Sequence, residues 1–315
     1  MTKIQSFPPI LVDIKHDQTP GDPDHVPAQV TAPLAALESF MSAELSRWNL
    51  PANLHDACAY ALLGGGKRLR PLLVIHAGAA AGATPERMYP AAAAVEMIHA
   101  FSLVHDDLPA LDNDDLRRGL PTLHKKHGEA MAILAGDGLM STAFQILTEH
   151  YEPAVAGVLC KELAVGTTRM ISGQVLDTLG GFAPTTTPND RVAMIHRDKT
   201  GALIRASCRM GIIAARTTHE REAIDALTSF GEAIGLMFQI VDDLLDVEQS
   251  AEHTGKRTGK DQDLGKLTYP GVLGVERSRQ EVERLLRTAE ASLEAFGARG
   301  AALRAIARYL ALRTR

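Results

Sequence analysis

The sequence predicts an all-α fold, a single large helical bundle, and three features of its composition indicate this. Hydrophobic residues make up 45% of the 315 residues, enough to bury a sizeable core. Aromatic residues make up only 4%, whereas alanine and leucine, which favour helices, are abundant. Runs of β-branched residues, which favour strands, are scarce. A chain of this length suits one large domain of roughly ten or more helices, at the usual length of about 11–12 residues each.

The N-terminal residues 1–31 are expected to form a flexible extension ahead of the main domain, residues 32–315. Several prolines and scattered charges without apolar periodicity occur in this extension. Apolar residues then recur at three- and four-residue steps, as on one face of a helix, at Leu34, Leu37, Met41 and Leu45. Pro51 closes this first helical segment.

Two later helix starts are marked by threonine followed by proline, at Thr84-Pro85 and Thr187-Pro188, because a capping hydroxyl and a proline both suit the first turn. Long runs of helical apolar periodicity cover residues 91–107, 129–149, 155–179, 188–215 and 220–247. The segments expected to be loops, which are rich in glycine, aspartate, threonine and basic residues, are Leu108–Thr122, Gly180–Thr187 and Gln249–Lys266. No glycine-rich phosphate loop follows a strand-like run, which argues against a nucleotide-binding α/β fold.

Charge and cysteine content disfavour several functional classes. The formal net charge is −5, so no nucleic-acid partner is indicated, and any anionic ligand must be met by local basic residues or metal ions. The cysteines, Cys58, Cys160 and Cys208, are far apart, which favours neither a disulfide framework nor a zinc site. We find no apolar run of about 18 residues and no signal peptide, so we expect no membrane span and a cytoplasmic location.

The first of two aspartate clusters is the strongest local signal. Asp106-Asp107 end an apolar run, Pro109 then bends the chain, and Asp112 follows. In an unbroken helix Asp106 and Asp112 would lie about 120° apart, and the bend can bring Asp112 back toward Asp106. An acidic patch at a helix end is also common as a solvated cap, so this cluster alone leaves both interpretations open.

The second cluster, Asp242-Asp243 with Asp246, lies inside a strongly apolar helical run. Asp242 and Asp246 share one helix face, about 6 Å apart along the axis. Carboxylates on an apolar face are costly unless they are neutralised. Together the two clusters indicate oxygen ligands for a hard divalent ion such as Mg²⁺, which commonly binds carboxylates along with phosphate oxygens.

Basic residues suited to phosphate occur near these clusters. Gly64–Pro71 (GGGKRLRP) is a glycine turn that leads into three cations within four positions. Glycine lets the backbone approach a ligand, and arginine matches phosphate oxygens in a bidentate manner. Alone, this segment could equally be a connecting turn with solvated charges. Arg117-Arg118 directly follow the first acidic cluster, and Lys199-Thr200 open another apolar segment.

With these motifs in this order, the chain resembles the polyprenyl synthetases, the family of trans-isoprenyl diphosphate synthases, across nearly all of residues 32–315. The motifs that carry the resemblance are Gly64–Pro71, Glu96–Gly119, Leu134–Leu139, Gly173-Gln174, Lys199-Thr200, Phe238–Asp246 and Gly265–Pro270. The four-residue spacer between Asp107 and Asp112 resembles that of bacterial farnesyl diphosphate synthases and their close geranylgeranyl relatives. The resemblance implies the isoprenoid synthase fold, a deep central cavity between the aspartate clusters, and a homodimer.

The resemblance also implies a reaction and its residues. Isopentenyl diphosphate would condense head to tail (1′-4) with dimethylallyl or geranyl diphosphate through an allylic carbocation, giving (2E,6E)-farnesyl diphosphate. The implied cofactor is Mg²⁺, about three ions per site, with Mn²⁺ as an alternative. The implied metal ligands are Asp106, Asp107, Asp112, Asp242, Asp243 and Asp246. The implied catalytic residues are Lys199, Thr200, Gln239, Asp106 and Asp242. The residues implied for isopentenyl diphosphate are Lys67, Arg70, His99 and Arg118, and those for the allylic diphosphate are Arg117, Lys199, Lys256 and Lys266.

Product length is implied to depend on Ser102 and Phe101, the residues four and five before Asp106, which line the tail pocket. Ser102 lies beneath Asp106 on an ideal helix, whereas Phe101 is about 100° further round, so the role of Phe101 rests on the resemblance. A large aromatic at this position resembles farnesyl-forming members. Geranylgeranyl or geranyl diphosphate synthase is the main alternative. A terpene cyclase or a non-catalytic partner subunit is disfavoured, because both aspartate motifs and the basic motif are complete.

Overall fold

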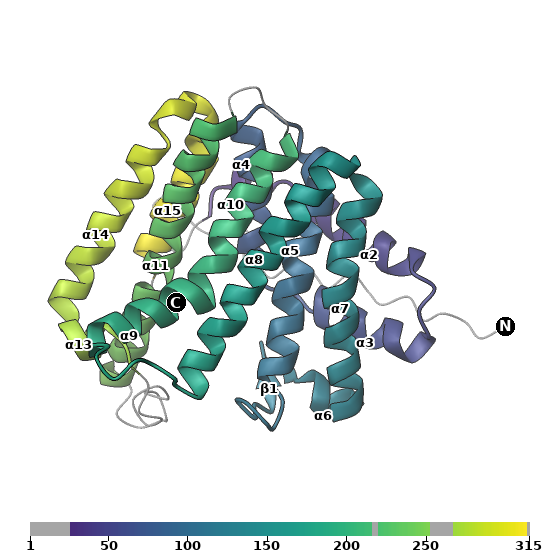
Figure 1. The fold of residues 1–315 in the computed structure, drawn as a ribbon, viewed down its shortest axis with the longest axis horizontal. Helices are drawn as coiled ribbons and strands as arrows, with labels where there is room; N and C mark the ends of the chain where they lie inside the picture. Colours follow the sequence, from purple (N-terminus) through teal and green to yellow (C-terminus); the bar gives the residue numbers. More distant parts are fainter. Residues whose placement is uncertain (1–25, 216–219, 253–266, 314–315) are drawn as a thin grey trace.

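A computed structural model of the chain describes residues 26–215, 220–252 and 267–313, and these form helices almost throughout (Figure 1). Within the described residues the only strands are β1 (Leu116–Arg117) and β2 (Leu120–Pro121), which pair antiparallel with Leu116 opposite Pro121. The predicted all-α fold is confirmed.

The helices of the first half begin and end close to the residues that the sequence pattern predicts. In chain order they are α1 (Ala28–Thr31), α2 (Leu34–Arg47), α3 (Ala52–Leu63), α4 (Leu69–Ala80), α5 (Pro85–Asp106), α6 (Leu123–His127), α7 (Glu129–His150) and α8 (Pro153–Thr178). Helix α5 starts at the predicted proline, although the Thr84 hydroxyl makes no capping hydrogen bond. The predicted apolar residues of α2 are buried, which confirms the face assigned to it.

The second half contains the longest helix and the two η segments. In chain order the elements are α9 (Pro188–Ile195), the π-helix η1 (His196–Gly201), α10 (Ala202–Ala215), α11 (Glu220–Glu252), α13 (Tyr269–Leu273), α14 (Val275–Ser292), the 3₁₀-helix η2 (Glu294–Gly300) and α15 (Ala301–Leu312). Helix α9 begins as predicted, because the Thr187 hydroxyl accepts a hydrogen bond from the Asp190 amide at 3.2 Å. Helix α11 extends to Glu252, past residue 249 where a loop was expected.

The described part of the N-terminal extension corrects one expectation. Residues 28–31 were expected to belong to a flexible segment, yet they form α1, and Val30 is fully buried. The Val30 carbonyl also accepts a hydrogen bond from Nε2 of His76 at 2.8 Å. The buried side chain and the hydrogen-bonded carbonyl of Val30 attach this short helix to the bundle. The proline content of the segment did not indicate this attachment.

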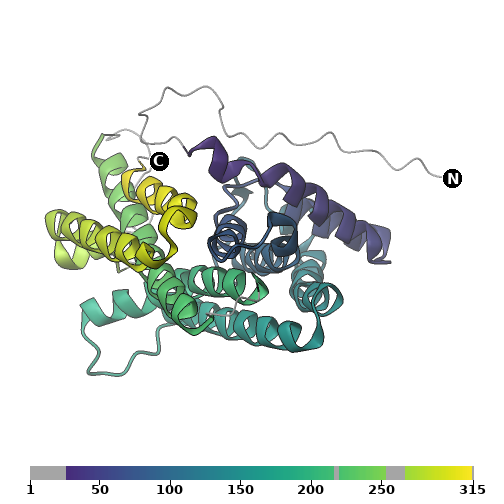
Figure 2. The same ribbon diagram turned by 90° about the horizontal axis from the view of Figure 1, so that it is seen from above.

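The centre of the bundle is formed by helices that lie side by side (Figures 1 and 2). Helix α5 packs against α4, α7 and α10, and α10 packs against α11. Four consecutive alanines, residues 91–94, are fully buried on α5. Because alanine side chains are small, they let neighbouring helices approach α5 from several directions at once.

Two helical segments, Glu129–His150 and Arg221–Val247, are long and apolar enough to cross a membrane by length and composition alone, with mean hydropathies of 1.4 and 1.3. About half of each is buried within the bundle, 44% and 50%, where α7 packs against α5 and α11 packs against α10. Core helices of a globular bundle meet the same test, so these two segments are weak support for a membrane span.

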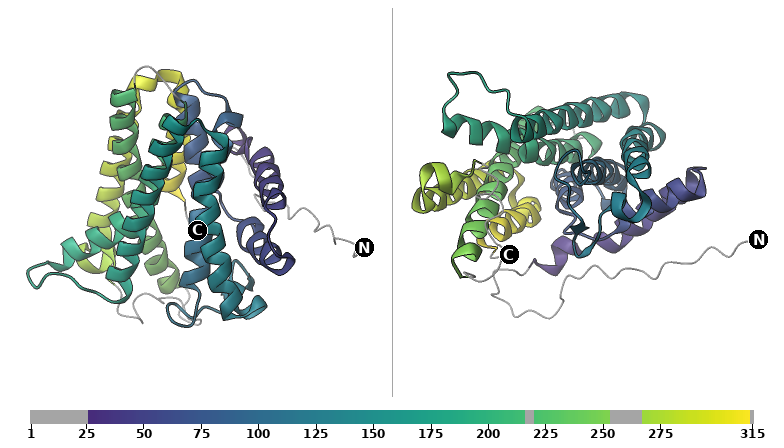
Figure 3. Two further views of the ribbon diagram at one scale, coloured as in Figure 1. Left: turned by 45° about the vertical axis from the view of Figure 1, so that its right-hand side comes forward. Right: turned by 90° about the horizontal axis from the view of Figure 1, so that it is seen from below.

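Several short elements and helix ends near the sequence motifs lie together at one end of the bundle (Figures 1 and 3). The C-terminal end of α5, the β1–β2 ribbon, α6, α9 and α13 all lie at this end. The first aspartate motif is at the end of α5, so its position in the fold is set by where that helix stops.

Candidate active site

The first aspartate motif turns back on itself as predicted. Helix α5 ends at Asp106, and the backbone amide of Asp112 donates to the Asp106 carbonyl oxygen at 2.8 Å. The bend therefore brings Asp112 next to Asp106. Burial raises the pKa of the Asp106 carboxyl to about 6, the charge of Lys199 opposes this shift, and the negative charge of Asp112 adds to it.

Asp107 faces a different neighbour from Asp106. Its side chain is nearly inaccessible, and its two carboxylate oxygens accept hydrogen bonds from Arg117, with Nε at 2.8 Å from Oδ1 and 2.9 Å from Oδ2. The expected metal ligand Asp107 and the expected diphosphate ligand Arg117 thus bind each other in this structure. Consecutive helical residues point about 100° apart, so Asp106 and Asp107 cannot both face one ion in the same way.

The first carboxylate of the second motif is paired with a residue that the sequence did not indicate. Asp242 lies on α11, and its Oδ1 accepts a hydrogen bond from Nη2 of Arg313 at 2.5 Å. Arg313 also donates to the Phe238 carbonyl at 2.9 Å and lies over the Phe238 ring, 4.1 Å from its centroid. Burial raises the pKa of the Asp242 carboxyl, and the charge of Arg313 opposes that shift.

Asp243, the next residue, is turned into the protein and is 4% exposed. Its Oδ2 accepts a hydrogen bond from the backbone amide of Tyr269 at 2.9 Å and lies 3.5 Å from Nε2 of His196. Asp246, one turn after Asp242, is half-buried. The second motif therefore repeats the arrangement of the first, in which the second aspartate is buried against donors.

The glycine-rich basic segment forms the turn between α3 and α4. Gly65 and Gly66 have φ of 86° and 125°, the left-handed region that glycine adopts without strain. Arg68 follows with φ of 47°, and its buried guanidinium donates to Glu96 on α5 at 2.6 Å. This ion pair fixes the turn between Lys67 and Arg70.

Three of the residues expected to bind isopentenyl diphosphate, Arg70, His99 and Arg118, lie close enough for the two arginine charges to affect the pKa of His99. The pKa of His99 is well below its ordinary value because the ring is buried and because Arg70 and Arg118 are positively charged. Arg118 also donates to the Gly65 carbonyl. Nε of Arg70 is buried without a hydrogen-bond partner in the described part of the chain, as expected for a group that awaits an anion. The charges of Lys67 and Arg70 reach Asp242, which connects this basic group to the second aspartate motif.

A cavity of about 410 Å³ joins several of these groups. The predicted site residues that line it are Arg70, His99, Phe101, Ser102, Asp106, Lys199 and Thr200. Met170 and Ile171 from α8 add an apolar wall. Phe101 and Ser102 both line this cavity although an ideal helix separates them by about 100°, because the cavity is wider than one helix stripe. The cavity thus has a charged end and an apolar wall, which suits a ligand with a charged head and an apolar tail.

Two residues of the cavity wall, Lys199 and Thr200, make hydrogen bonds to neighbouring side chains. The Thr200 hydroxyl donates to Oε1 of Gln239 at 2.7 Å, and Nζ of Lys199 pairs with Asp177 at 2.6 Å. Gln174 belongs to the matched motif Gly173-Gln174 and Asp177 follows it three residues later on α8, but neither residue was assigned a role from the sequence. Oε1 of Gln174 is buried without a hydrogen-bond partner among the described residues. The expected ligands Lys256 and Lys266 lie outside the described residues.

The exposed and half-buried carboxylates of the two motifs fit a divalent ion. Asp106, Asp112, Asp242 and Asp246 offer the oxygen donors that Mg²⁺ prefers, and the raised pKa values of Asp106 and Asp242 indicate carboxylates whose burial is not fully compensated by nearby cations. Asp107 is less suited because both of its oxygens accept hydrogen bonds from Arg117, and Asp243 because it is almost completely buried, whereas Arg313 occupies only Oδ1 of Asp242.

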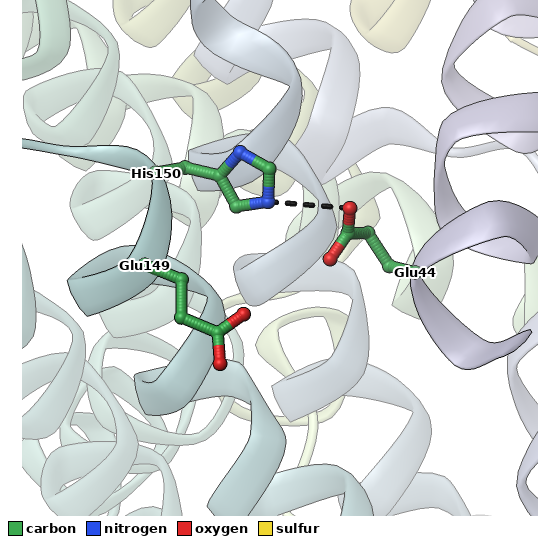
Figure 4. Close-up of side chains that lie close together, drawn as sticks. All are labelled: Glu44, Glu149 and His150. Atoms are coloured by element: carbon green, nitrogen blue, oxygen red, sulfur yellow. Dashed lines mark ion pairs between the residues drawn. The ribbon is translucent and has the colours of Figure 1, made fainter. Parts of the chain in front are cut away.

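A separate acidic group on α2 and α7 could also hold a metal by ligand geometry (Figure 4). Ligand atoms of Glu44, Glu149 and His150 lie within 4.8 Å of one another, and Nε2 of His150 is 3.2 Å from Glu44. However, Arg47 donates to Glu44 at 2.6 Å and to Glu149 at 3.1 Å. A guanidinium therefore already neutralises these carboxylates, which makes this group a poorer metal site than the aspartate motifs.

Comparisons with known proteins agree with this geometry. Residues 51–298 match the family described as Polyprenyl synthetase. The farnesyl diphosphate synthase of Escherichia coli (strain K12) is 44% identical over 302 residues, covering 93% of this chain and 99% of that protein. The chloroplastic geranylgeranyl pyrophosphate synthase 3 of Arabidopsis thaliana is 44% identical over 271 residues, 84% of this chain and 75% of that protein. The crystal structure of a geranyltransferase from Legionella pneumophila superimposes with a TM-score of 0.79 at 33% identity, covering 90% of this chain and 95% of that one.

Proposed function

Since this chain belongs to the polyprenyl synthetase family of prenyltransferases, we propose that it makes (2E,6E)-farnesyl diphosphate from isopentenyl diphosphate and dimethylallyl or geranyl diphosphate. One observation carries the proposal. A single cavity is lined by Asp106, Lys199 and Thr200 at its polar end and by Phe101 and Met170 along its apolar wall. An allylic diphosphate has the same division between a charged head and an apolar tail.

Four aspartates would hold the metal in this proposal, namely Asp106, Asp112, Asp242 and Asp246. When bound, Mg²⁺ stabilises the charge that builds on the departing diphosphate. Lys199 adds a positive charge at the same head group, as Arg117 would if it exchanged Asp107 for the diphosphate. Lys256 and Lys266 remain proposed ligands of the allylic diphosphate from the sequence alone.

The polar oxygens of Thr200 and Gln239 would face the allylic carbocation, where their dipoles stabilise positive charge. The apolar wall from α8 excludes water, which would otherwise hydrolyse the cation. No separate protein base is required, because the released diphosphate can take the proton that the cationic condensation intermediate loses as it becomes the product.

Isopentenyl diphosphate would bind through Lys67, Arg70, His99 and Arg118. The unpartnered Nε of Arg70 supports this assignment, because a buried guanidinium nitrogen without an acceptor is costly until an anion supplies one. Burial and the nearby arginines lower the pKa of His99 in the protein without ligand, and the ring can donate a hydrogen bond to a phosphate oxygen in either protonation state.

The farnesyl product is the finer part of the proposal, and it rests on Phe101, which lines the cavity. A bulky aromatic there leaves less length for the growing prenyl tail than a small side chain would. Geranylgeranyl diphosphate is the second candidate, because a geranylgeranyl pyrophosphate synthase from Arabidopsis is as similar to this chain as the farnesyl diphosphate synthase from E. coli. Geranyl diphosphate synthesis, a terpene cyclase and a non-catalytic subunit have no specific observation in their favour.

We also propose a homodimer and a cytoplasmic location. Large apolar side chains that do not line the cavity are exposed on α7 and α8, where a second copy of the chain could cover them, and they are Ile133, Leu134, Val158 and Val165. The competing location is the chloroplast, because the Arabidopsis geranylgeranyl pyrophosphate synthase 3 is a chloroplastic protein.

Product analysis of the purified protein tests the proposal. The protein is incubated with Mg²⁺, isopentenyl diphosphate and either dimethylallyl or geranyl diphosphate, and the products are dephosphorylated and sized by chromatography. We expect farnesol as the final product. Geranylgeraniol would favour the second candidate, and the absence of any prenyl product longer than the starter would overturn the assignment of a synthase.

A further inference from the structure

The two proposed catalytic residues Lys199 and Thr200 lie in a π-helix, η1, that interrupts the path from α9 to α10. Single π-turns are rare and are found frequently at functional sites. The packing of η1 against α8 and α11 fixes where Lys199 and Thr200 lie.

The backbone of η1 is held between two glycines on neighbouring helices. A Cβ atom on Gly173 of α8 would lie 2.1 Å from the amide nitrogen of Lys199. A Cβ atom on Gly235 of α11 would lie 2.8 Å from Cα of Gly201. Because neither position has room for a side chain, α8 and α11 both contact η1 backbone to backbone.

Helix α11 continues this contact with two polar side chains. Gly235, Gln239 and Asp243 are each four residues apart, so they share one face of α11. Gln239 accepts the hydrogen bond from Thr200, and Asp243 lies 3.5 Å from Nε2 of His196. His196 and Thr200 are themselves four apart, so η1 meets α11 at both of its ends.

The His196 end also connects to α13. The His196 ring is stacked on Tyr269 with centroids 5.3 Å apart and an angle of 23° between the rings. The Tyr269 amide donates to the same Asp243 oxygen that faces His196. Burial lowers the pKa of His196 to about 4, so the ring is neutral at neutral pH and can donate from Nε2. The buried Asp243 carboxylate thus connects α11, η1 and α13.

We propose that His196 and Asp243 are positioning residues of the synthase, which hold the π-turn so that Lys199 and Thr200 reach the substrate cavity. In this account Asp243 orients η1 and does not bind metal, although it is adjacent to the proposed metal ligand Asp242. This inference rests on the proposed function, because that function identifies the reaction. The contacts from which we argue are the same whatever the length of the prenyl product.

The first test compares two adjacent carboxylates. Asp243→Asn keeps an oxygen for the Tyr269 amide and a polar group toward His196, whereas Asp242→Asn removes a proposed metal ligand. We expect Asp243→Asn to keep the wild-type Mn²⁺ stoichiometry and most of kcat, and Asp243→Leu to lose kcat on the order of 100-fold, as misplacement of a catalytic group does. Asp242→Asn should weaken Mn²⁺ binding. If Asp243→Asn weakens Mn²⁺ binding as much as Asp242→Asn does, Asp243 is a metal ligand and the inference is wrong.

The second test removes the imidazole nitrogen and keeps the ring. His196→Phe can still stack on Tyr269 but cannot reach Asp243 with a polar atom. We expect a loss of kcat of about tenfold or more, with the KM for isopentenyl diphosphate unchanged, because that substrate is held by other residues. The matched control is His76→Phe, which removes another buried histidine, whose Nε2 donates to the Val30 carbonyl. His76→Phe should leave kcat unchanged, and an equal loss in both variants would reduce the role of His196 to general stability.

A binding measurement keeps the inference testable if the wild type forms no prenyl product. Calorimetry with Mg²⁺ and inorganic pyrophosphate reports on Lys199 without turnover. His196→Phe should weaken pyrophosphate binding relative to both the wild type and His76→Phe, because Lys199 is displaced. An inactive wild type would therefore refute the proposed function, whereas unchanged pyrophosphate binding and unchanged kcat in His196→Phe would refute the positioning role.

Discussion

Arg313 donates from Nη2 to Oδ1 of Asp242 at 2.5 Å, so a guanidinium one residue beyond the end of α15 rests on the first carboxylate of the second aspartate motif. The Arg313 side chain is almost completely buried there, between that carboxylate and the Phe238 ring. In this structure Arg313 provides the positive charge that a divalent ion would otherwise provide. A metal ion that binds Asp242 must therefore share or displace this guanidinium.

Removing that guanidinium should lower the metal requirement. In Arg313→Gln the ion no longer competes with a positive charge for Asp242, so we expect the Mg²⁺ concentration that gives half-maximal activity to fall several-fold. The control is Arg308→Gln on α15, whose exposed side chain pairs with Glu290 and should contribute little. An unchanged or higher Mg²⁺ requirement in Arg313→Gln would show that the pair does not compete with metal.

The sequence alone could not have revealed this pair. Asp242 and Arg313 are 71 residues apart, and their contact depends on how α15 docks against α11. The aspartate motifs themselves were predictable, because adjacent carboxylates in an apolar helical run are a local signal. It was also predictable that Asp107 points away from Asp106 and Asp243 from Asp242, because consecutive helical residues point about 100° apart.

Opening the cavity wall at Phe101 should lengthen the product. The Phe101 ring is buried, lines the cavity, and contacts His105 edge to face with ring centroids 5.2 Å apart. Phe101→Ala removes the ring and gives the growing tail more room, at a cost in stability of about 3–5 kcal/mol. Chromatography of the products should show prenyl chains longer than those of the wild type.

Phe40→Ala is the matched control, because Phe40 of α2 packs against Tyr89 of α5 and does not line the cavity. Its product should keep the wild-type length. If Phe101→Ala also keeps that length, a different part of the cavity sets the limit, and the apolar wall at Met170 and Ile171 becomes the next position to examine.

Metal affinity should depend on pH through Asp106. Burial raises the pKa of this carboxyl to about 6 in the metal-free protein, and Mg²⁺ or Mn²⁺ binds the ionised form. The affinity for Mn²⁺ should therefore increase as the pH rises from about 5 to 7 and then level off. Titrations that follow free Mn²⁺ by electron paramagnetic resonance measure this directly. Asp106→Asn should abolish the step near pH 6, and an affinity that is already constant at about pH 5 would contradict a raised pKa.

The buried ion pair between Arg68 and Glu96 should be essential to the fold of the basic turn. Their side chains are 1% and 4% exposed, so Arg68→Met would leave an unpaired buried carboxylate and lower the free energy of unfolding by about 3–5 kcal/mol. The double variant Arg68→Met/Glu96→Leu should recover most of that loss, because neither member of this pair is then buried without the other. Arg284→Met breaks an exposed pair with Glu281 and should cost about 1 kcal/mol or less. Equal effects in denaturant unfolding of Arg68→Met and Arg284→Met would contradict this account.

The two residues proposed to limit product length, Phe101 and Ser102, show how well ideal helix geometry predicts which side chains line the cavity. From the sequence, Ser102 was placed beneath Asp106, whereas Phe101 was about 100° away and was assigned only by resemblance. In the structure both line the cavity, because α8 faces α5 across a wide gap that Met170 and Ile171 help to line. The positions of Lys199 and Thr200 were not predictable in detail either, since the π-turn that carries them is held by glycines from two other helices.

The central claim, that the two aspartate motifs hold one diphosphate through shared divalent ions, is tested most directly by anomalous diffraction. Crystals would be soaked with Mn²⁺ and inorganic pyrophosphate, and the Mn²⁺ positions located at the manganese absorption edge. We expect Mn²⁺ at Asp106 and Asp112 and at Asp242, with pyrophosphate between them. Mn²⁺ bound instead at Glu44, Glu149 and His150, with none at Asp106 or Asp242, would contradict the account.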